Sequence, residues 1–340
     1  MMKFRNKYIL AIFIYILSLN SLIAAEINIY SHRQPFLINP FLEAFTQETG
    51  IKTNVVYATK GLAQRLRAEG KNSPADLILT VDIGRLYIYE DLDLLSEVSS
   101  PILDDNIPKH LKSERNTWFA LSKRSRIIAT SKERLKKDDI LRIEDLADPK
   151  WKGKICSRPG SHVYNRALMA SIIAEYGLKK AEDWAAGLVS NLARRPQGND
   201  RAQVKGIFEG LCDIAIINNY YFGKLKYSED PTQREWAKSM RLTFPNQGEG
   251  DRGAHINISG GGIAKYSKNK KAAQKLLEFL SGEKSQKMYS EINFEYPVNI
   301  KVQPSEELIS WGSFREDKIS VEKIAQLSIE AQKIIDKVGW

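Results

Sequence analysis

Two adjacent tyrosines, Tyr220 and Tyr221, follow an apolar, β-branched run that begins at Cys212. The run predicts a short buried strand that ends at Asn218 and Asn219. Successive side chains of a strand point to opposite faces, so neighbouring phenols converge on one target only where the strand gives way to a turn or helix. Strand ends are also where open α/β sheets place their ligands. The pair therefore indicates half of a metal site, with two half-buried tyrosines that cap a core strand as the alternative.

Phenolate oxygen is a hard anionic donor that suits a trivalent, strongly polarising cation such as Fe(III). Its formation removes a proton from a group whose pKa is near 10, so the affinity of such a site falls as the pH falls. A third phenol, Tyr164, is predicted in the first turn of a helix that follows Ser157–Ser161, beside the positive end of that helix. Taken alone, Tyr164 also fits a packing role.

Several basic and polar residues are placed to hold an anion that completes a coordination sphere. Thr59–Gly61, which contains Lys60, stands at a predicted helix start, where free N–H groups and the helix dipole favour anions. Arg33, Gln34 and Arg126 add further donors, and an arginine fork suits a carboxylate or carbonate. For each residue the alternative is a solvated side chain or an ordinary salt bridge.

The four histidines lie in no context typical of a catalytic or zinc site; they are His32, His110, His162 and His255. The chain has no G-x-S-x-G, H-E-x-x-H, P-loop or G-x-G-x-x-G motif. Gly260–Gly262 indicates a close approach between strands rather than a phosphate cradle. We therefore expect no catalysis, and an exported enzyme with tyrosine as acid or base is the alternative.

The first 25 residues have the pattern of a secretory signal peptide. Lys3, Arg5 and Lys7 precede an apolar stretch that ends in small residues at Ala25, where we expect cleavage. A transmembrane anchor is the alternative, but the uninterrupted apolar part, Tyr8–Leu17, is too short to span a bilayer comfortably. The mature protein is thus expected in the periplasm.

Charge and cysteine content constrain the partners. Loss of the three N-terminal cations lowers the formal net charge from +10 to +7, and the remaining basic residues are interspersed with acidic ones. This distribution favours an anionic ligand or simple solubility, and we expect no nucleic acid partner. Cys156 and Cys212 are the two cysteines of the chain, which in an oxidising compartment predicts a disulfide; a metal pair is the alternative.

The order of elements predicts two α/β lobes. Strands at Glu26–Tyr30, Lys52–Tyr57 and Asp76–Val81 alternate with helices, the first of which opens at Pro40, and this pattern is typical of a parallel, doubly wound sheet. Similar alternation resumes near Lys154.

Two long extended segments, Trp118–Thr130 and His255–Ala264, predict a two-stranded hinge between the lobes. The predicted first lobe comprises residues 26–125 and 252–300, and the second lobe residues 126–251 and 301–340.

Several segments of the chain match one family of transport proteins. They are Ile29–Arg33, Pro74–Asp76, Ser122–Ile127, Trp151–Lys154, Asn218–Tyr221 and Glu295–Pro297. In these segments the chain resembles the periplasmic ferric-ion-binding proteins of the FbpA and FutA type, which are the substrate-binding components of iron ABC importers. The resemblance implies a class II, transferrin-like clam-shell fold, Fe(III) as cargo, an ABC permease in the inner membrane as partner, and a monomer.

The resemblance also implies site residues. Tyr164, Tyr220 and Tyr221 match the family's second-lobe phenolates, and Arg126 matches its anion-contacting hinge arginine. The first lobe differs, because Gln34 stands where some relatives carry a ligand histidine. The chain therefore looks like a tyrosine-rich subclass in which an anion such as carbonate fills that side, with a contribution from His32 or Tyr30 left open. A receptor for an anion or small organic ligand remains the alternative within transport.

Overall fold

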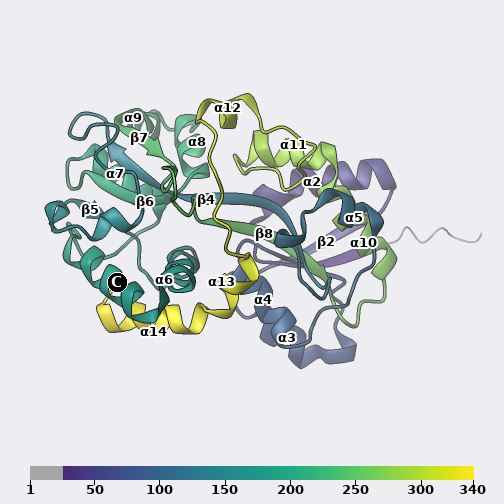
Figure 1. The fold of residues 1–340 in the computed structure, drawn as a ribbon. Coiled ribbons are helices and arrows are strands. Elements are labelled where there is room, and N and C mark those ends of the chain that lie inside the picture. Colours follow the sequence, from purple (N-terminus) through teal and green to yellow (C-terminus); the bar gives the residue numbers. More distant parts are fainter. Residues whose placement is uncertain (1–25) are drawn as a thin grey trace, which may run out of the picture.

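The computed structural model describes residues 26–340, so the predicted signal peptide lies outside the described residues. The described chain forms two lobes, and β4 (Phe119–Ser131) and β8 (Ile256–Ile263) pass from one to the other (Figure 1). This arrangement confirms the predicted two-lobed α/β fold with two hinge strands. Within residues 26–340, every helix is too short or too polar to cross a membrane.

The elements before β4 belong to the first lobe. They are β1 (Glu26–Ser31), α2 (Pro35–Thr49), β2 (Lys52–Tyr57), α3 (Leu62–Glu69), β3 (Leu77–Thr80), α4 (Ile83–Asp91) and α5 (Pro101–Asn106), with 3-10 turns at Gly70–Asn72 and Lys109–Leu111. The elements between β4 and β8 are 3-10 turns at Glu144–Ala147 and Pro149–Trp151, β5 (Ile155–Cys156), α6 (Val163–Ser190), α7 (Asp200–Phe208), β6 (Ile214–Asn218), α8 (Tyr220–Lys226), α9 (Pro231–Ser239) and β7 (Met240–Thr243). After β8 come α10 (Lys270–Ser281), α11 (Glu283–Ile292), α12 (Glu306–Ser310), α13 (Val321–Gln326) and α14 (Ser328–Val338).

The strands form one continuous series in the order β2-β1-β3-β8-β4-β6-β5, with β7 also paired to β4. The pairs β1–β2, β1–β3 and β5–β6 are parallel, as the alternation of strands and helices predicts. The two crossing strands are antiparallel to their neighbours, so the sheet is mixed rather than purely parallel. Along β4, Phe119–Ser125 pairs with β8, and Arg126–Ser131 pairs with β6 and β7.

The three glycines of β8 lie where neighbouring backbone comes close. A Cβ atom at Gly260 would lie 2.6 Å from the Phe119 carbonyl oxygen, and one at Gly261 would lie 2.7 Å from that of Ile78. Any larger residue would push apart the strands that flank β8. This confirms the prediction of a close strand approach.

The segment after β8 contacts both lobes. Helix α13 packs against α4 in the first lobe and α6 in the second, and α14 runs along α6 (Figure 1). The segment is also joined to the crossing strand β4 by an ion pair of 2.7 Å between Lys123 and Glu316.

One predicted helix boundary is wrong. Helix α2 begins at Pro35, so Pro40 lies inside it rather than at its start. Proline is tolerated in the first turn because its missing N–H would be unpaired there, and Pro35 takes that position. Gly50 ends the helix in a left-handed conformation (φ 71°).

Candidate functional site

The strand β6 delivers the tyrosine pair to the interior of the protein. All of its residues, Ile214–Asn218, are buried, and Asn219 then caps the short helix α8. The Asn219 side chain accepts a hydrogen bond from the Ser125 backbone N–H (2.8 Å) and donates to the Phe294 carbonyl (3.3 Å). These bonds fix the start of α8 against the crossing strand, and the Tyr220 and Tyr221 rings lie with centroids 4.5 Å apart.

The third predicted phenol lies beside this pair. The Tyr220 hydroxyl donates to the Tyr164 hydroxyl across 3.1 Å, and it accepts a hydrogen bond from the Asn218 side-chain amide (3.2 Å). Tyr164 is the second residue of α6, whose first turn is capped by His162. Together with Tyr221, these phenols line a cavity of about 340 Å³, called the tyrosine cavity below.

Cationic side chains surround the phenols. Those lining the tyrosine cavity are Arg33, Arg85, Arg124, Arg158, Arg201 and Lys224. The guanidinium carbons of Arg124 and Arg158 lie 5.5 Å and 5.2 Å from the centre of the Tyr164 ring. Nη1 of Arg124 is buried and has no hydrogen-bond partner among residues 26–340. This donor is therefore available to an anion in the cavity.

Burial governs the ionisation of Tyr220 and Tyr221. It raises the pKa of Tyr220 well above its ordinary value near 10, and the nearby phenols of Tyr164 and Tyr221 raise it further. Burial raises the pKa of Tyr221 as well, with Asp200 adding to the effect. In the absence of a metal these two phenols are neutral at pH 7.

A buried network lies behind the tyrosine cavity. Asp200, the first residue of α7, pairs with Arg126 (2.6 Å) and Arg158 (3.1 Å), and it accepts the backbone N–H of Asn218 (2.9 Å). Burial alone would raise the pKa of Asp200, but the two guanidinium groups hold it below its ordinary value. Both terminal nitrogens of Arg126 are therefore engaged behind the cavity, and of the two β4 arginines it is Arg124, two residues earlier, that lines the cavity.

The first-lobe side offers fewer free donors. Nδ1 of His32 lies 2.8 Å from the Ala58 carbonyl and Nε2 lies 3.0 Å from the Tyr89 hydroxyl, so both ring nitrogens are engaged. Burial lowers the pKa of His32, which keeps the ring neutral. Tyr30 points elsewhere and donates to the Glu69 carboxylate across 2.8 Å.

Two other predicted first-lobe residues line the tyrosine cavity. Gln34 is one of them. Arg33 is the other, but its guanidinium pairs with Glu295 (2.9 Å) and donates to Ser259 (2.8 Å).

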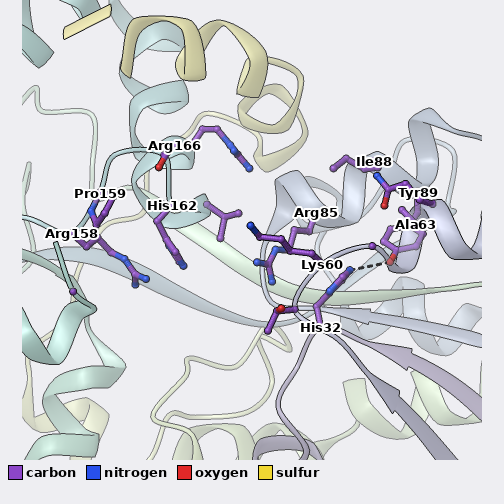
Figure 2. A pocket seen from close by; sticks show the side chains of 16 residues that line it. His32, Lys60, Ala63, Arg85, Ile88, Tyr89, Arg158, Pro159, His162 and Arg166 are labelled. Atoms are coloured by element: carbon purple, nitrogen blue, oxygen red, sulfur yellow. Dashed lines mark hydrogen bonds between the residues drawn. The ribbon is translucent and has the colours of Figure 1, made fainter. Parts of the chain in front are cut away.

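A second cavity of about 590 Å³ adjoins the first and shares His32, Arg85 and Arg158 with it. In Figure 2, Lys60 and Arg85 approach this outer cavity from one side, and Arg158 and Arg166 approach it from the other. Lys60 stands just before Gly61, which caps α3 in a left-handed conformation (φ 86°). The outer cavity is therefore strongly cationic.

Sequence reasoning missed five of the six cations that line the tyrosine cavity, namely Arg85, Arg124, Arg158, Arg201 and Lys224. A usable signal existed for Arg158, because it lies in the Ser157–Ser161 segment that precedes the helix of Tyr164. For Lys224, one turn after Tyr220, helical spacing placed it near the pair. Burial lowers the pKa of Lys224 to about 8.

The predicted disulfide is present. Cys156 and Cys212 are joined by an S–S bond of 2.04 Å between the end of β5 and the residues just before β6. Among residues 26–340, no group of three or more histidine, cysteine, aspartate or glutamate side chains is placed to hold a metal ion.

Comparison with known proteins defines the class to which this fold and site belong. A family model described as bacterial extracellular solute-binding protein matches residues 72–314. The chain belongs to this family of solute-binding proteins, whose members are receptors rather than enzymes.

Individual relatives are similar over nearly the whole chain. Iron uptake protein A1 of Synechocystis sp. is 42% identical, with 93% of this chain and 87% of that protein covered. The ferric iron-binding protein A of Mannheimia haemolytica, solved in an open conformation, is 46% identical with a TM-score of 0.86, covering 93% of this chain and 98% of that one. The FutA (IdiA) protein of Trichodesmium, solved in complex with iron and citrate, is 42% identical with a TM-score of 0.88, covering 93% and 100%.

Proposed function

We propose that this protein is a periplasmic Fe(III) receptor that binds iron through the phenolates of Tyr164, Tyr220 and Tyr221. The observation that carries the proposal is the convergence of the three phenols on one cavity, with the Tyr164 and Tyr220 oxygens 3.1 Å apart. Two oxygens at this separation can both bind one metal ion. Relatives named for iron uptake and ferric iron binding support the same cargo.

Iron binding in this site requires proton release. Because burial keeps Tyr220 and Tyr221 neutral, Fe(III) has to displace their protons as it binds. Only a strongly polarising cation does this at neutral pH, so the burial of the phenols disfavours weaker Lewis acids such as Mg²⁺ or Ca²⁺.

The remaining coordination positions are proposed to hold an anion such as carbonate. Arg124, Arg158 and Arg201 are the donors that lie nearest to the phenol rings. Arg33 and Gln34 line the same cavity, and Lys60 lines the outer cavity. Cations in the cavity repel a bare trivalent ion, whereas an anion that enters with the iron offsets that repulsion. His32 is the first-lobe residue that a metal could recruit, at the cost of one hydrogen bond.

The proposed cycle places the protein in the periplasm, after cleavage of the signal peptide near Ala25, as a monomer that delivers iron to an ABC permease in the inner membrane. The proposed lobes, residues 26–125 with 252–300 and residues 126–251 with 301–340, would close on the ion by bending at β4 and β8. No nucleic acid takes part in this proposal.

The experiment that tests the proposal is purification of the mature protein after exposure to ferric citrate. We expect one iron atom per protein and a visible charge-transfer band that Tyr220→Phe combined with Tyr221→Phe abolishes. A colourless protein without bound iron would refute the proposal.

The cationic outer cavity favours one second candidate, a receptor for an anionic organic ligand. Such a ligand would be held by Lys60, Arg85 and Arg166 and would not need the phenols. Calorimetry with phosphate and with citrate, both without iron, separates the anion receptor from the iron receptor. The anion receptor would be favoured if Tyr220→Phe binds these anions as the wild type does and the wild type binds no iron.

A further inference from the structure

The loop Ser157–Ser161 connects β5 to α6 and brings two side chains to the tyrosine cavity. Arg158 lies within it, and Tyr164 follows it in the first turn of α6. The placement of both side chains therefore depends on what holds this loop.

Trp340, which follows α14, packs against this loop, and its side chain is only 5% exposed. Its indole N–H donates to the Ser157 hydroxyl (2.9 Å), and its carbonyl accepts the Gly160 N–H (3.0 Å). A Cβ atom at Gly160 would lie 2.7 Å from the Trp340 ring, so the loop and the indole are in direct contact. The ring also packs edge-on against Trp184, with centroids 5.8 Å apart.

Ser157 connects Trp340 to the residues around Tyr164. The Asn165 side chain donates to the Ser157 hydroxyl (3.2 Å) and to the Arg158 carbonyl (3.0 Å), and its oxygen accepts from Arg126. Asn165 is the residue next to Tyr164 on α6. The indole, Ser157 and Asn165 thus form a chain of hydrogen bonds that ends beside the phenol.

We propose that Trp340 is a positioning residue for the iron site: it fixes the Ser157–Ser161 loop and, through Ser157 and Asn165, the ring of Tyr164. This inference rests on the proposed function in so far as Tyr164 binds iron. It assigns to Trp340 a role beyond filling space, because the indole N–H is the group that reaches Ser157.

The test compares Trp340→Phe with the wild-type full chain. Phenylalanine keeps an aromatic ring at the position but removes the donor, so we expect iron release to a competing chelator, followed by decay of the visible band, to become roughly fivefold faster, the effect of one lost neutral hydrogen bond. Ser157→Ala should have a similar effect, and the double variant should be no faster than either single variant by more than about twofold.

Trp118→Phe is the matched control. Its indole N–H also donates to a side-chain oxygen, that of Glu90 (2.6 Å), but in the first lobe. The Trp118→Phe variant should lower the melting temperature at least as much as Trp340→Phe while leaving the rate of iron release unchanged. Equal rates in Trp340→Phe and the wild type, or an equal acceleration in Trp118→Phe, would overturn the proposal.

A second measurement separates this inference from the iron proposal. In the iron-free protein with ring-labelled tyrosine, the NMR resonance of Tyr164 should move in Trp340→Phe and stay in place in Trp118→Phe. If the wild type binds no iron, the ferric proposal fails, and the positioning of Tyr164 is still decided by this spectrum. An unmoved Tyr164 resonance would refute the role of Trp340.

Discussion

At the scale of single residues, Tyr220 is the phenol with the most partners. It donates to Tyr164 and accepts from Asn218, and its pKa is raised well above its ordinary value by burial. Replacing its hydroxyl would remove one of the proposed phenolate ligands without removing the ring.

We therefore expect Tyr220→Phe to weaken iron binding by more than roughly 100-fold, the upper end of the loss caused by an outer-shell change. Competition against a soluble ferric chelator measures this loss. Tyr227→Phe is the control, because Tyr227 lies at the end of the same helix but is exposed and donates to Glu307. Equal affinities in the two variants would contradict the assignment.

The phenol pKa values also set the direction of pH dependence. Tyr220 and Tyr221 have pKa values above their ordinary value in the metal-free protein, so each must lose a proton to bind iron. Affinity should then fall as the pH falls, by about tenfold per pH unit for each phenol that ionises on binding. Chelator competition between pH 8 and pH 6, corrected for protonation of the chelator, checks this slope. An affinity that stays constant over this range would rule out neutral phenols as the source of the ligands.

Individual residues were predictable from the sequence where local pattern determined them. The adjacent tyrosines follow a strand that its own β-branched residues specify, so their place at a strand end could be predicted. The roles of Arg124 and Arg126 could not be predicted, because their side chains lie on the same face of β4. Only the folded chain shows that Asp200, which is distant in the sequence, pairs with Arg126. The role of His32 could not be predicted either, because Ala58 and Tyr89, the partners of its two ring nitrogens, come close to it only in the folded chain.

At the scale of elements, Asp200 joins the start of α7 to the hinge strand and to the loop before α6. Asp200→Asn would leave the buried guanidinium groups of Arg126 and Arg158 without a counter-charge. We expect the free energy of unfolding to fall by about 3 kcal/mol or more.

Urea unfolding monitored by circular dichroism measures the effect of Asp200→Asn. The control is Asp183→Asn, which breaks a solvent-exposed ion pair with Lys179 and should change stability little. If the two variants lose equal stability, the buried network has no special role.

The disulfide constrains the strands that lead to all three phenols. Its cysteines are 56 positions apart, and closure of a loop of that length stabilises the folded state by about 4 kcal/mol in the chain-entropy model. We expect the double variant Cys156→Ala, Cys212→Ala to unfold at lower urea concentration, with a loss of about 2 to 4 kcal/mol. An unchanged midpoint would show that the unfolded chain is not restrained by this bond.

Element boundaries were less predictable than element types. Pro35 and Pro40 both fit an early helical position by sequence, and only the packed helix shows that α2 starts at the first of them. In α6, Gly177 adopts a non-helical conformation (φ 78°), so this element consists of two helical parts joined at a kink.

At the scale of the whole molecule, one series of paired strands runs through both lobes. The sequence predicted the crossings because Phe119–Ser131 and Ile256–Ile263 are long extended runs. It did not predict their antiparallel pairing, since strand order depends on contacts distant in the chain. Strand β8 pairs with β4 over Phe119–Ser125, with a register shift between Ala120 and Ser122, and we expect the proposed lobe closure to bend the chain at these two strands.

The central claim is that tyrosine phenolates hold the iron. Resonance Raman spectroscopy of the ferric protein, excited within its visible band, tests it most directly. We predict ring modes of iron-bound tyrosinate that shift when the protein is made with ring-deuterated tyrosine and disappear when Tyr164, Tyr220 and Tyr221 are all replaced by phenylalanine. Iron-loaded protein without these modes, or with modes that survive the triple replacement, would contradict it.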